Sequence, residues 1–482
     1  MQLVKLITPK RINTLRVKLA AFLILFFSAF QPALSQDNSP YSRYGIGDLV
    51  PPTNINSRGL GGLSAAFNEP LSINFSNPAS FSSFQTDKEL KSNKLKSGRA
   101  ILDVGINLEN RTLKDPAFAE RFTASNALFS YVQVGVPLKQ NWGLSFGLRP
   151  ISRISYKIRR RELLYDPITS QRIDSAETLF SGSGGSYLAS MGTGFSLFKR
   201  LKKDKSGKEI IGEEKLSVGF TAGYLFGEKD YSTKRTIFND TLSSDYYNQA
   251  NYQTTTNYGN LNFSAGIQYK VPLKKNLMLT LGAYGAWGQT VNASQDVLRE
   301  TFIYDASIGE VRLDSVSDKR NVKGKIDLPS SITAGFVLQK YTVINKEGGW
   351  LIGVDFAQQS WDKYRFYGQI DSVQSKWEIR VGGQLNPIPK RNYFSNIAYR
   401  FGFFMGPDYI KVGKKLNQIG GSFGLGLPLA TTRQAPNQAT LINLAFEYGK
   451  RGNNSNLLSE SLFRVSLGFS LSDFWFIKRK YD

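Results

Sequence analysis

The stretch Leu441-Ile-Asn-Leu-Ala-Phe-Glu-Tyr448 alternates large apolar residues with Asn443, Ala445 and Glu447. Successive side chains of a β-strand point to opposite faces, so this period of two predicts a strand with one apolar and one polar face. Similar stretches, most of them with glycine, recur from Ile101 to the C-terminus, among them Leu102-Asp-Val-Gly-Ile-Asn-Leu-Glu109, Trp377-Glu-Ile-Arg-Val-Gly-Gly-Gln-Leu385 and Phe463-Arg-Val-Ser-Leu-Gly-Phe-Ser-Leu471. The series predicts an all-β fold, a transmembrane antiparallel β-barrel, because closure lets every backbone N–H and C=O pair inside lipid.

The N-terminus has the features of a secretion signal. Five Lys or Arg and no acidic residue occupy the first eighteen positions, ahead of the apolar run 19–30 and the small residues of Ala33-Leu-Ser35. We therefore expect residues 1–35 to be a signal peptide that is cleaved after Ser35. No other stretch has the roughly 18 apolar residues of a membrane helix, so a membrane location requires strands. We predict that the chain resides in the outer membrane of a Gram-negative cell.

Composition excludes most catalytic and cofactor chemistry. The chain has no His and no Cys, so it lacks imidazole bases, thiolate nucleophiles and His or Cys ligands for a metal. We expect no enzyme activity, no metal and no cofactor. The net charge of +23 would suit nucleic acid, but the expected counterions of an exported chain are anionic lipid headgroups and lipopolysaccharide phosphates.

The alternating stretches number about fourteen, an even count that is typical of single-chain bacterial barrels. The stretch 215–238 is long enough for one strand or two. Short connections such as 137–141 alternate with longer polar ones, which lie near 110–125, 160–176, 239–250 and 300–323. Periplasmic turns are short and extracellular loops long, so both ends of the barrel, residues 99–482, are expected in the periplasm. The basic connection 199–214 is longer than this pattern predicts.

Alternation also predicts which side chains face the lumen. The even positions of 441–448 should contact lipid and the odd positions the lumen. The same rule sends a set of charged residues to the lumen: Asp103, Arg149, Arg153, Asp355, Glu378, Arg380, Glu447 and Arg464. They form either a structural network that stiffens the barrel and holds a plug, or a ligand-binding site. Aromatic residues near strand ends, such as Trp142, Trp361 and Trp475, are expected in the interfacial girdles.

Residues 36–98 do not alternate. Two of their segments, Ser57-Arg-Gly-Leu-Gly-Gly-Leu-Ser-Ala-Ala66 and Ile73-Asn-Phe-Ser-Asn-Pro-Ala-Ser-Phe81, are moderately apolar, and the first is rich in glycine. A disordered tail would be more charged and less aromatic. A compact hatch inside the lumen fits better, since glycines allow close approach to the wall and Asn77-Pro78 favours a turn or a short helix.

The order of these motifs resembles the outer-membrane long-chain fatty-acid transporter family. An Arg-Gly-x-Gly-Gly motif (Arg58, Gly59, Gly61, Gly62) precedes an Asn-Pro-Ala motif (Asn77, Pro78, Ala79), and a barrel follows. Ser80-Phe81 departs from the family's commoner Gly followed by an apolar residue. The resemblance implies a barrel of about fourteen strands with an N-terminal hatch. It also implies passive uptake of long-chain fatty acids or other hydrophobic compounds, which settle against the hatch and leave after it rearranges.

Pro150 bears on a sideways exit through the wall. It follows Arg149 inside the third strand, where proline cannot donate to the ladder, so a kink or a local gap is expected. The resemblance implies that such a kink at Arg149 and Pro150 is a lateral gate. The alternative is that Pro150 lies at a strand end or bulge and only shapes the rim.

Two functions from different classes remain open. One is uptake of hydrophobic compounds through a hatch-gated barrel. The other is a non-transporting barrel that acts as an accessory or scaffold subunit of a secretion or surface-assembly complex, in which the connection 199–214 could contact a partner. A general porin is disfavoured because the hatch would fill the lumen. The expected partners are outer-membrane lipid, lipopolysaccharide, a hydrophobic small molecule and, during biogenesis, the barrel-assembly machinery; we expect a monomer that binds no nucleic acid.

Overall fold

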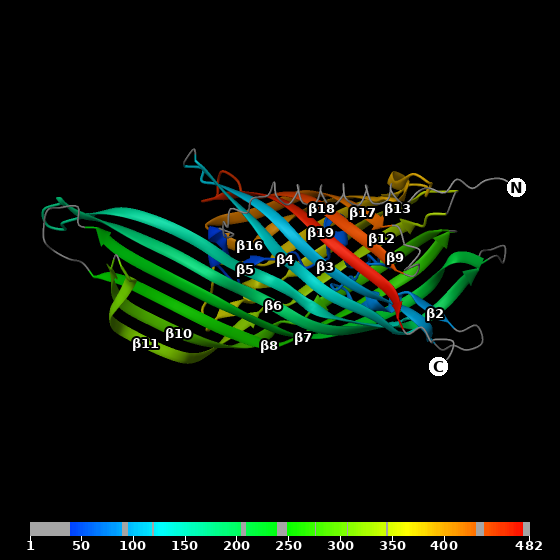
Figure 1. The fold of residues 1–482 in the computed structure, drawn as a ribbon, viewed down its shortest axis with the longest axis horizontal. Coiled ribbons are helices and arrows are strands. Elements are labelled where there is room, and N and C mark those ends of the chain that lie inside the picture. Colours follow the sequence, from blue (N-terminus) through cyan, green and yellow to red (C-terminus); the bar gives the residue numbers. More distant parts are fainter. Residues whose placement is uncertain are drawn as a thin grey trace.

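A computed structural model describes residues 39–88, 95–117, 120–203, 209–238, 248–274, 276–305, 307–343, 346–429 and 438–475. The predicted signal peptide, 1–35, lies outside these residues. The described strands form one antiparallel sheet that closes on itself, because β19 (Ser459–Trp475) pairs with β3 (Leu95–Lys114). The protein is therefore a closed β-barrel, seen from the side in Figure 1.

The wall of the barrel contains 14 strands in the described part of the chain. Besides β3 and β19 its segments are β4 (Arg121–Lys139), β5 (Trp142–Tyr165), β6 (Arg172–Lys203), β7 (Glu209–Phe238), β8 (Gln249–Lys274), β9 (Leu277–Ala286), β10 (Gln289–Asp305), β11 (Gly309–Leu328), β12 (Ser331–Lys340), β13 (Gly349–Gln359), β15 (Lys376–Asn386), β16 (Ala398–Val412), β17 (Lys414–Leu429) and β18 (Ala439–Arg451). β9 and β10 pair with successive parts of β8 and act as one interrupted wall strand, and β11 and β12 form the next in the same way. The predicted count of about fourteen strands is confirmed.

The alternation in the sequence determines which way each side chain faces. In β18, Asn443 and Ala445 are buried, and only 8% of Glu447 is exposed, whereas Tyr448 points outward and is half exposed. The polar face of the strand therefore lines the lumen. Two short turns are closed by asparagines with positive φ, Asn141 and Asn276, a conformation that asparagine tolerates better than most residues.

Several strands are longer than predicted. β5 runs to Tyr165 and β6 begins at Arg172, so most of the loop predicted at 160–176 is strand. The same holds at 300–323, where β10 and β11 leave only a short turn. A strand crosses a membrane with about 9–11 residues. The residues of a longer strand that lie beyond the membrane need no apolar face, so the strand continues there without the alternation of apolar and polar residues.

The long strands project together from one end of the barrel. β6 has 32 residues and β7 has 30, and β5 stays paired with β6 up to Tyr165 opposite Arg172. Figure 1 shows β6, β7, β8, β10 and β11 extending to the left beyond the strands of the other side of the barrel. The stretch 215–238 lies in a single strand, β7, and not in two. β6 and β7 also extend into the connection predicted at 199–214, of which residues 204–208 lie outside the described part.

Residues 39–84, called the hatch from here on, contribute mostly buried side chains. They contain the 3-10 helix η1 (Pro40–Arg43), the two-residue strand β1 (Asp48–Leu49), the short helix α2 (Ile55–Arg58) and the 3-10 helix η2 (Pro78–Ser83); β2 (Thr86–Lys88) then leads to the wall. Asn54 caps α2 by accepting a hydrogen bond from the Ser57 N–H at 2.9 Å. None of the described helices combines the length and the apolar character needed to cross a membrane.

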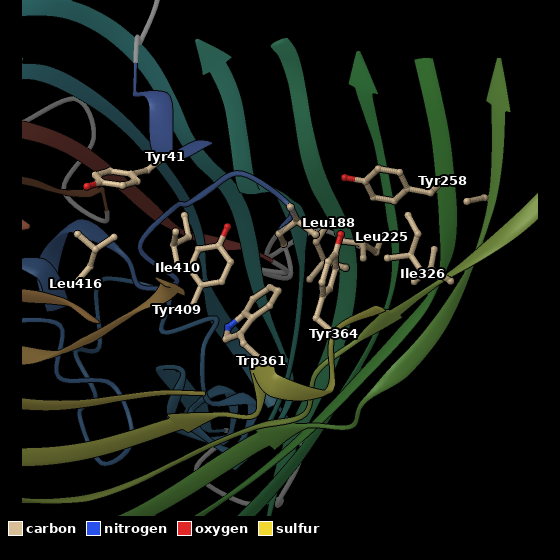
Figure 2. Close-up of a cluster of buried hydrophobic side chains, with 13 residues drawn as sticks. Tyr41, Leu188, Leu225, Tyr258, Ile326, Trp361, Tyr364, Tyr409, Ile410 and Leu416 are labelled. Carbon is tan, nitrogen blue, oxygen red and sulfur yellow. The ribbon is translucent and has the colours of Figure 1, made fainter. Parts of the chain in front are cut away.

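An aromatic cluster occupies the lumen where the long strands leave the barrel. It brings Tyr41 of the hatch together with Trp361, Tyr364 and Tyr409, and Figure 2 shows Leu188 among these rings. Trp361 belongs to the 3-10 helix η3 (Trp361–Lys363), which with the short strand β14 (Arg365–Phe366) connects β13 to β15. Only 5% of Trp361 is exposed, so its predicted place in an interfacial girdle is wrong. The sequence around it resembles a strand end, but the segment packs into the cluster.

Candidate functional site

Arg58 of the hatch motif lies at the seam where the barrel closes. Its Nη1 donates to Asn107 Oδ1 on β3 at 2.7 Å and more weakly to Ser466 Oγ on β19, and its Nη2 donates to Ser130 Oγ on β4 at 2.9 Å. Only 1% of the residue is exposed, and burial lowers the pKa of the guanidinium to about 10, which leaves it charged at neutral pH. One hatch residue therefore links three wall strands.

The glycines of the hatch motif allow backbone-to-backbone contact with the wall. Gly61 and Gly62 have φ values of 69° and 92°, which glycine adopts without strain. The Gly61 N–H donates to Ser422 Oγ on β17 at 3.0 Å, and a Cβ added to Gly402 of β16 would overlap the Gly61 backbone. A Cβ added to Gly59 would lie 3.0 Å from the Gly424 Cα.

The Asn-Pro-Ala motif begins η2 and fastens it to the opposite wall. Asn77 Oδ1 accepts from the Ala79 N–H at 3.1 Å, and Asn77 Nδ2 donates to the Ala65 carbonyl at 2.7 Å. A Cβ added to Gly219 of β7 would overlap the Pro78 backbone. The two motifs thus hold opposite sides of the hatch.

Asp103 and Asp355, two of the predicted luminal charges, bind hatch backbone. Asp355 Oδ2 accepts from the Ser64 and Ala65 N–H groups at 2.7 and 2.9 Å, and Asp103 Oδ2 accepts from the Ile73 N–H at 3.0 Å. In the part of the chain that the structure describes, neither carboxylate lies within ion-pair distance of a cation. Both therefore serve as anchors for the hatch.

The other predicted luminal charges form two groups. Arg464 Nε lies 2.7 Å from Glu109 and its Nη1 3.3 Å from Glu447, and Arg153 lies 4.0 Å from the same Glu109. On β15, Glu378 lies 2.5 Å from Arg380 and 3.1 Å from Lys376. Glu109 and Lys376 were missed, although alternation places both on the luminal face.

A further charged cluster ties β1 of the hatch to the wall. Asp48 lies 2.9 Å from Arg111 and 2.8 Å from Arg451, and Glu460 accepts from both arginines. Burial alone would raise the pKa of the Asp48 carboxyl, but the two guanidiniums outweigh it and hold the pKa below its ordinary value. Asp48 lies outside any alternating segment, so no pattern in the sequence pointed to this cluster.

A cavity of about 350 Å³ lies between the hatch and the wall. One side is apolar and includes Leu49, Ile151, Leu188 and Leu225; the other carries Lys376, Glu378, Arg380, Arg451 and Arg464. Arg149 also faces the cavity, with its guanidinium 5.4 Å from the centre of the Phe75 ring, and it forms no ion pair among the described residues. The cavity therefore combines an apolar side with the positive charge of Arg149, which no carboxylate among the described residues neutralises.

Next to the cavity, the wall opens between β4 and β5. The two strands pair from Lys139 and Trp142 up to Val132 and Leu148, and no further pairing between them occurs in the described residues. Pro150 lies just past this point, at a register shift in the pairing of β5 with β6. In place of β4, β1 of the hatch pairs with Ser152 and Arg153, and the Arg153 side chain bridges to the Phe129 carbonyl of β4 at 2.5 Å.

Asn77→Ala is expected to loosen the hatch without changing the barrel. It removes the cap of η2 and the bond to Ala65, which together contribute about 1–2 kcal/mol. Urea denaturation of the purified protein measures the loss. Asn392→Ala is the matched control, because Asn392 caps the exposed 3-10 helix η4 (Tyr393–Asn396) in the same way; equal losses in both variants would contradict the anchoring role of Asn77.

The matches to known proteins cover nearly the whole chain. The BamG family model matches residues 16–482. Similar solved structures include a Pseudomonas aeruginosa FadL homologue (11% identity, 90% of this chain and 100% of that chain, TM-score 0.49), the CymD monoaromatic hydrocarbon channel (11%, 89% and 98%, 0.46) and the Pseudomonas putida toluene transporter TodX (15%, 89% and 99%, 0.46). No curated protein matches the chain.

Proposed function

The chain belongs to the BamG family, and we propose that its barrel takes up hydrophobic or amphipathic compounds, such as long-chain fatty acids, across the outer membrane. The observation that carries this function is the position of the cavity. Leu49 and Ile151 line its apolar side, and they lie where β4 has stopped pairing with β5. A molecule held in the cavity is therefore adjacent to a part of the wall where the ladder is incomplete.

The lining of the cavity favours a ligand with an apolar body and an anionic end. Leu188 and Leu225 offer apolar surface to the body, while Arg149 and Arg380 place positive charge nearby. A carboxylate next to Arg149 would supply the counter-charge that this guanidinium lacks among the described residues, since charge-assisted hydrogen bonds to arginine are strong. Long-chain fatty acids have this chemistry.

Passage into the membrane requires the hatch to move. β1 covers the opening with only two residue pairs to β5, Asp48 with Arg153 and Leu49 with Ser152. Backbone hydrogen bonds of this kind contribute about 0.5–1.5 kcal/mol each. The ladder that holds β1 over the opening is therefore weak. The ion pairs of Asp48 with Arg111 and Arg451 then hold the closed position.

Pro150→Val is expected to reduce uptake several-fold. Valine restores an N–H at position 150 and favours a continuous strand, which extends the β4–β5 ladder and narrows the opening. The measurement is uptake of tritiated oleate and radiolabelled toluene by cells that produce the variant. Pro428→Val in β17 is the control, because Pro428 is opposite Leu441 of β18 and does not line the cavity. Unchanged uptake in a folded Pro150→Val barrel would contradict lateral passage.

A second candidate is the accessory subunit of a surface-assembly complex. It is favoured by the tight packing of the lumen, since the hatch contacts wall glycines directly and its Tyr41 is part of the aromatic cluster. Mass spectrometry of lipids that co-purify with the barrel separates the two functions. Bound fatty acid and measurable oleate uptake support transport; absence of both, with a stoichiometric membrane or periplasmic partner, supports the accessory role.

A further inference from the structure

Beyond the barrel the long strands form an open sheet with a free edge on β5. Residues 158–165 of β5 pair with β6, from Ile158 opposite Phe180 to Tyr165 opposite Arg172. No described strand pairs with the other side of this segment. In Figure 1 the tip of the β3–β4 hairpin lies apart from the tips of the long strands, so β4 does not cover the edge.

The hatch already forms backbone hydrogen bonds with the preceding part of the same edge, between residues 151 and 155. The Val50 N–H donates to the Ile151 carbonyl at 2.9 Å, and the Ser39 N–H donates to the Ser155 carbonyl at 3.2 Å. The Ser155 N–H also points this way, toward Ser42 Oγ. Backbone groups alternate in direction along a strand, so those of Arg159, Arg161 and Leu163 face the same side as Ser155. These N–H and C=O groups continue the row of backbone donors and acceptors along this edge, and the hatch bonds only to the groups at the start of the row.

The free edge carries an excess of positive charge. The side chains of Arg159, Arg160 and Arg161 are 62%, 70% and 72% exposed. Together with Arg235 they share two carboxylates, those of Glu162 and Glu177. Like charges on facing strands are unfavourable and opposite charges favourable, so the edge repels a second copy of itself and complements an acidic strand.

We propose that residues 158–165 of β5 bind an extended, acidic segment of a partner protein by strand addition. Main-chain hydrogen bonds would provide the affinity and the three arginines the preference for acidic side chains. Exposed edges of this kind are usually blocked by charges, bulges or covering loops; here charge selects the partner strand. The site is independent of uptake, because it lies on the projecting part of the sheet and not on the cavity.

The test uses synthetic peptides and the purified full-length chain. The probe is a fluorescein-labelled peptide of alternating Glu and Val, with its binding followed by fluorescence anisotropy. Two matched peptides carry Lys in place of Glu, or N-methyl groups on alternate residues that block one edge of the peptide. We expect the Glu peptide to bind and each matched peptide to bind about tenfold more weakly, a difference of about 1.4 kcal/mol. Equal binding of the N-methylated peptide would overturn strand addition and indicate electrostatic adsorption only.

Two variants at one position separate backbone from charge. Arg159→Pro removes an N–H that faces the free side, without touching the ladder to β6, and should weaken the Glu peptide about tenfold. Arg159→Gln keeps this N–H and removes the charge, so it should lose only a few-fold. If Arg159→Pro binds like the parent protein, the proposal is wrong. Self-association of the parent that Arg159→Pro abolishes would also overturn it, since the occupant would then be a second copy.

Discussion

Gly382→Ala is expected to displace the hatch, whereas Gly383→Ala, the next residue of β15, is expected to leave it in place. A Cβ at Gly382 would overlap the Leu60 carbonyl of the hatch, while a Cβ at Gly383 would meet the Leu351 carbonyl at an ordinary 3.6 Å. The overlap is with backbone, which cannot rotate away, so the cost should reach about 1–3 kcal/mol. Substitution at Gly383 should stay within about 0.5 kcal/mol.

The difference between the two variants has a functional readout as well as a thermodynamic one. Urea denaturation measures the loss of stability, and conductance in planar bilayers reports whether a displaced hatch leaves a water-filled path. We expect conductance for Gly382→Ala and none for Gly383→Ala. Gly402→Ala, which would press on Gly61 from the neighbouring strand, should behave like Gly382→Ala. Identical behaviour of Gly382→Ala and Gly383→Ala would show that the hatch does not depend on close contact with the wall.

The faces of the barrel strands could be predicted from the sequence because burial in a two-sided wall imposes a period of two. Asn443, Glu447 and Arg464 lie on the luminal face for this reason. The predicted hatch motifs fall where the chain contacts the wall, since Arg58 and Asn77 both bind across the lumen. These residues were visible because glycine, asparagine and proline have strong local preferences.

The remaining features depend on contacts between distant segments. Asp48 meets Arg451 across 403 positions of the chain, and no local pattern marks such a pair. The projecting part of β11 is largely polar on both faces, so the alternation that identifies strands in the wall is weak there. Trp361 was misplaced because its neighbours resemble a strand end, whereas packing against Tyr364 and Tyr409 determines its position.

A disulfide between the hatch and the wall is expected to abolish uptake completely when it forms. The parent chain has no cysteine, so Ile55→Cys combined with Gly468→Cys introduces one possible bond, from α2 to β19. A Cβ built on Gly468 lies 3.2 Å from the Ile55 Cβ, slightly below the roughly 3.5–4.5 Å typical of disulfides. A small shift of either backbone therefore suffices, and the bond would prevent the hatch from leaving the wall.

The effect of the disulfide must be separated from the effects of the two substitutions that introduce it. Ile55 is 1% exposed, so its replacement by cysteine removes buried apolar contacts and lowers stability by about 1–3 kcal/mol. The single variants and the reduced double variant carry the same losses without the bond. The single variants should retain the uptake that their stability permits in oxidising and reducing conditions alike, and the double variant should do so only when it is reduced.

The most direct measurement is therefore tritiated oleate uptake by cells with the Ile55→Cys, Gly468→Cys barrel, before and after treatment with a membrane-permeant reductant. If the hatch must rearrange for a hydrophobic compound to pass, the oxidised protein takes up no oleate above the level of cells without the barrel, and reduction restores uptake. Uptake that is equal in the oxidised and reduced states, with the disulfide verified on a gel, would contradict a moving hatch.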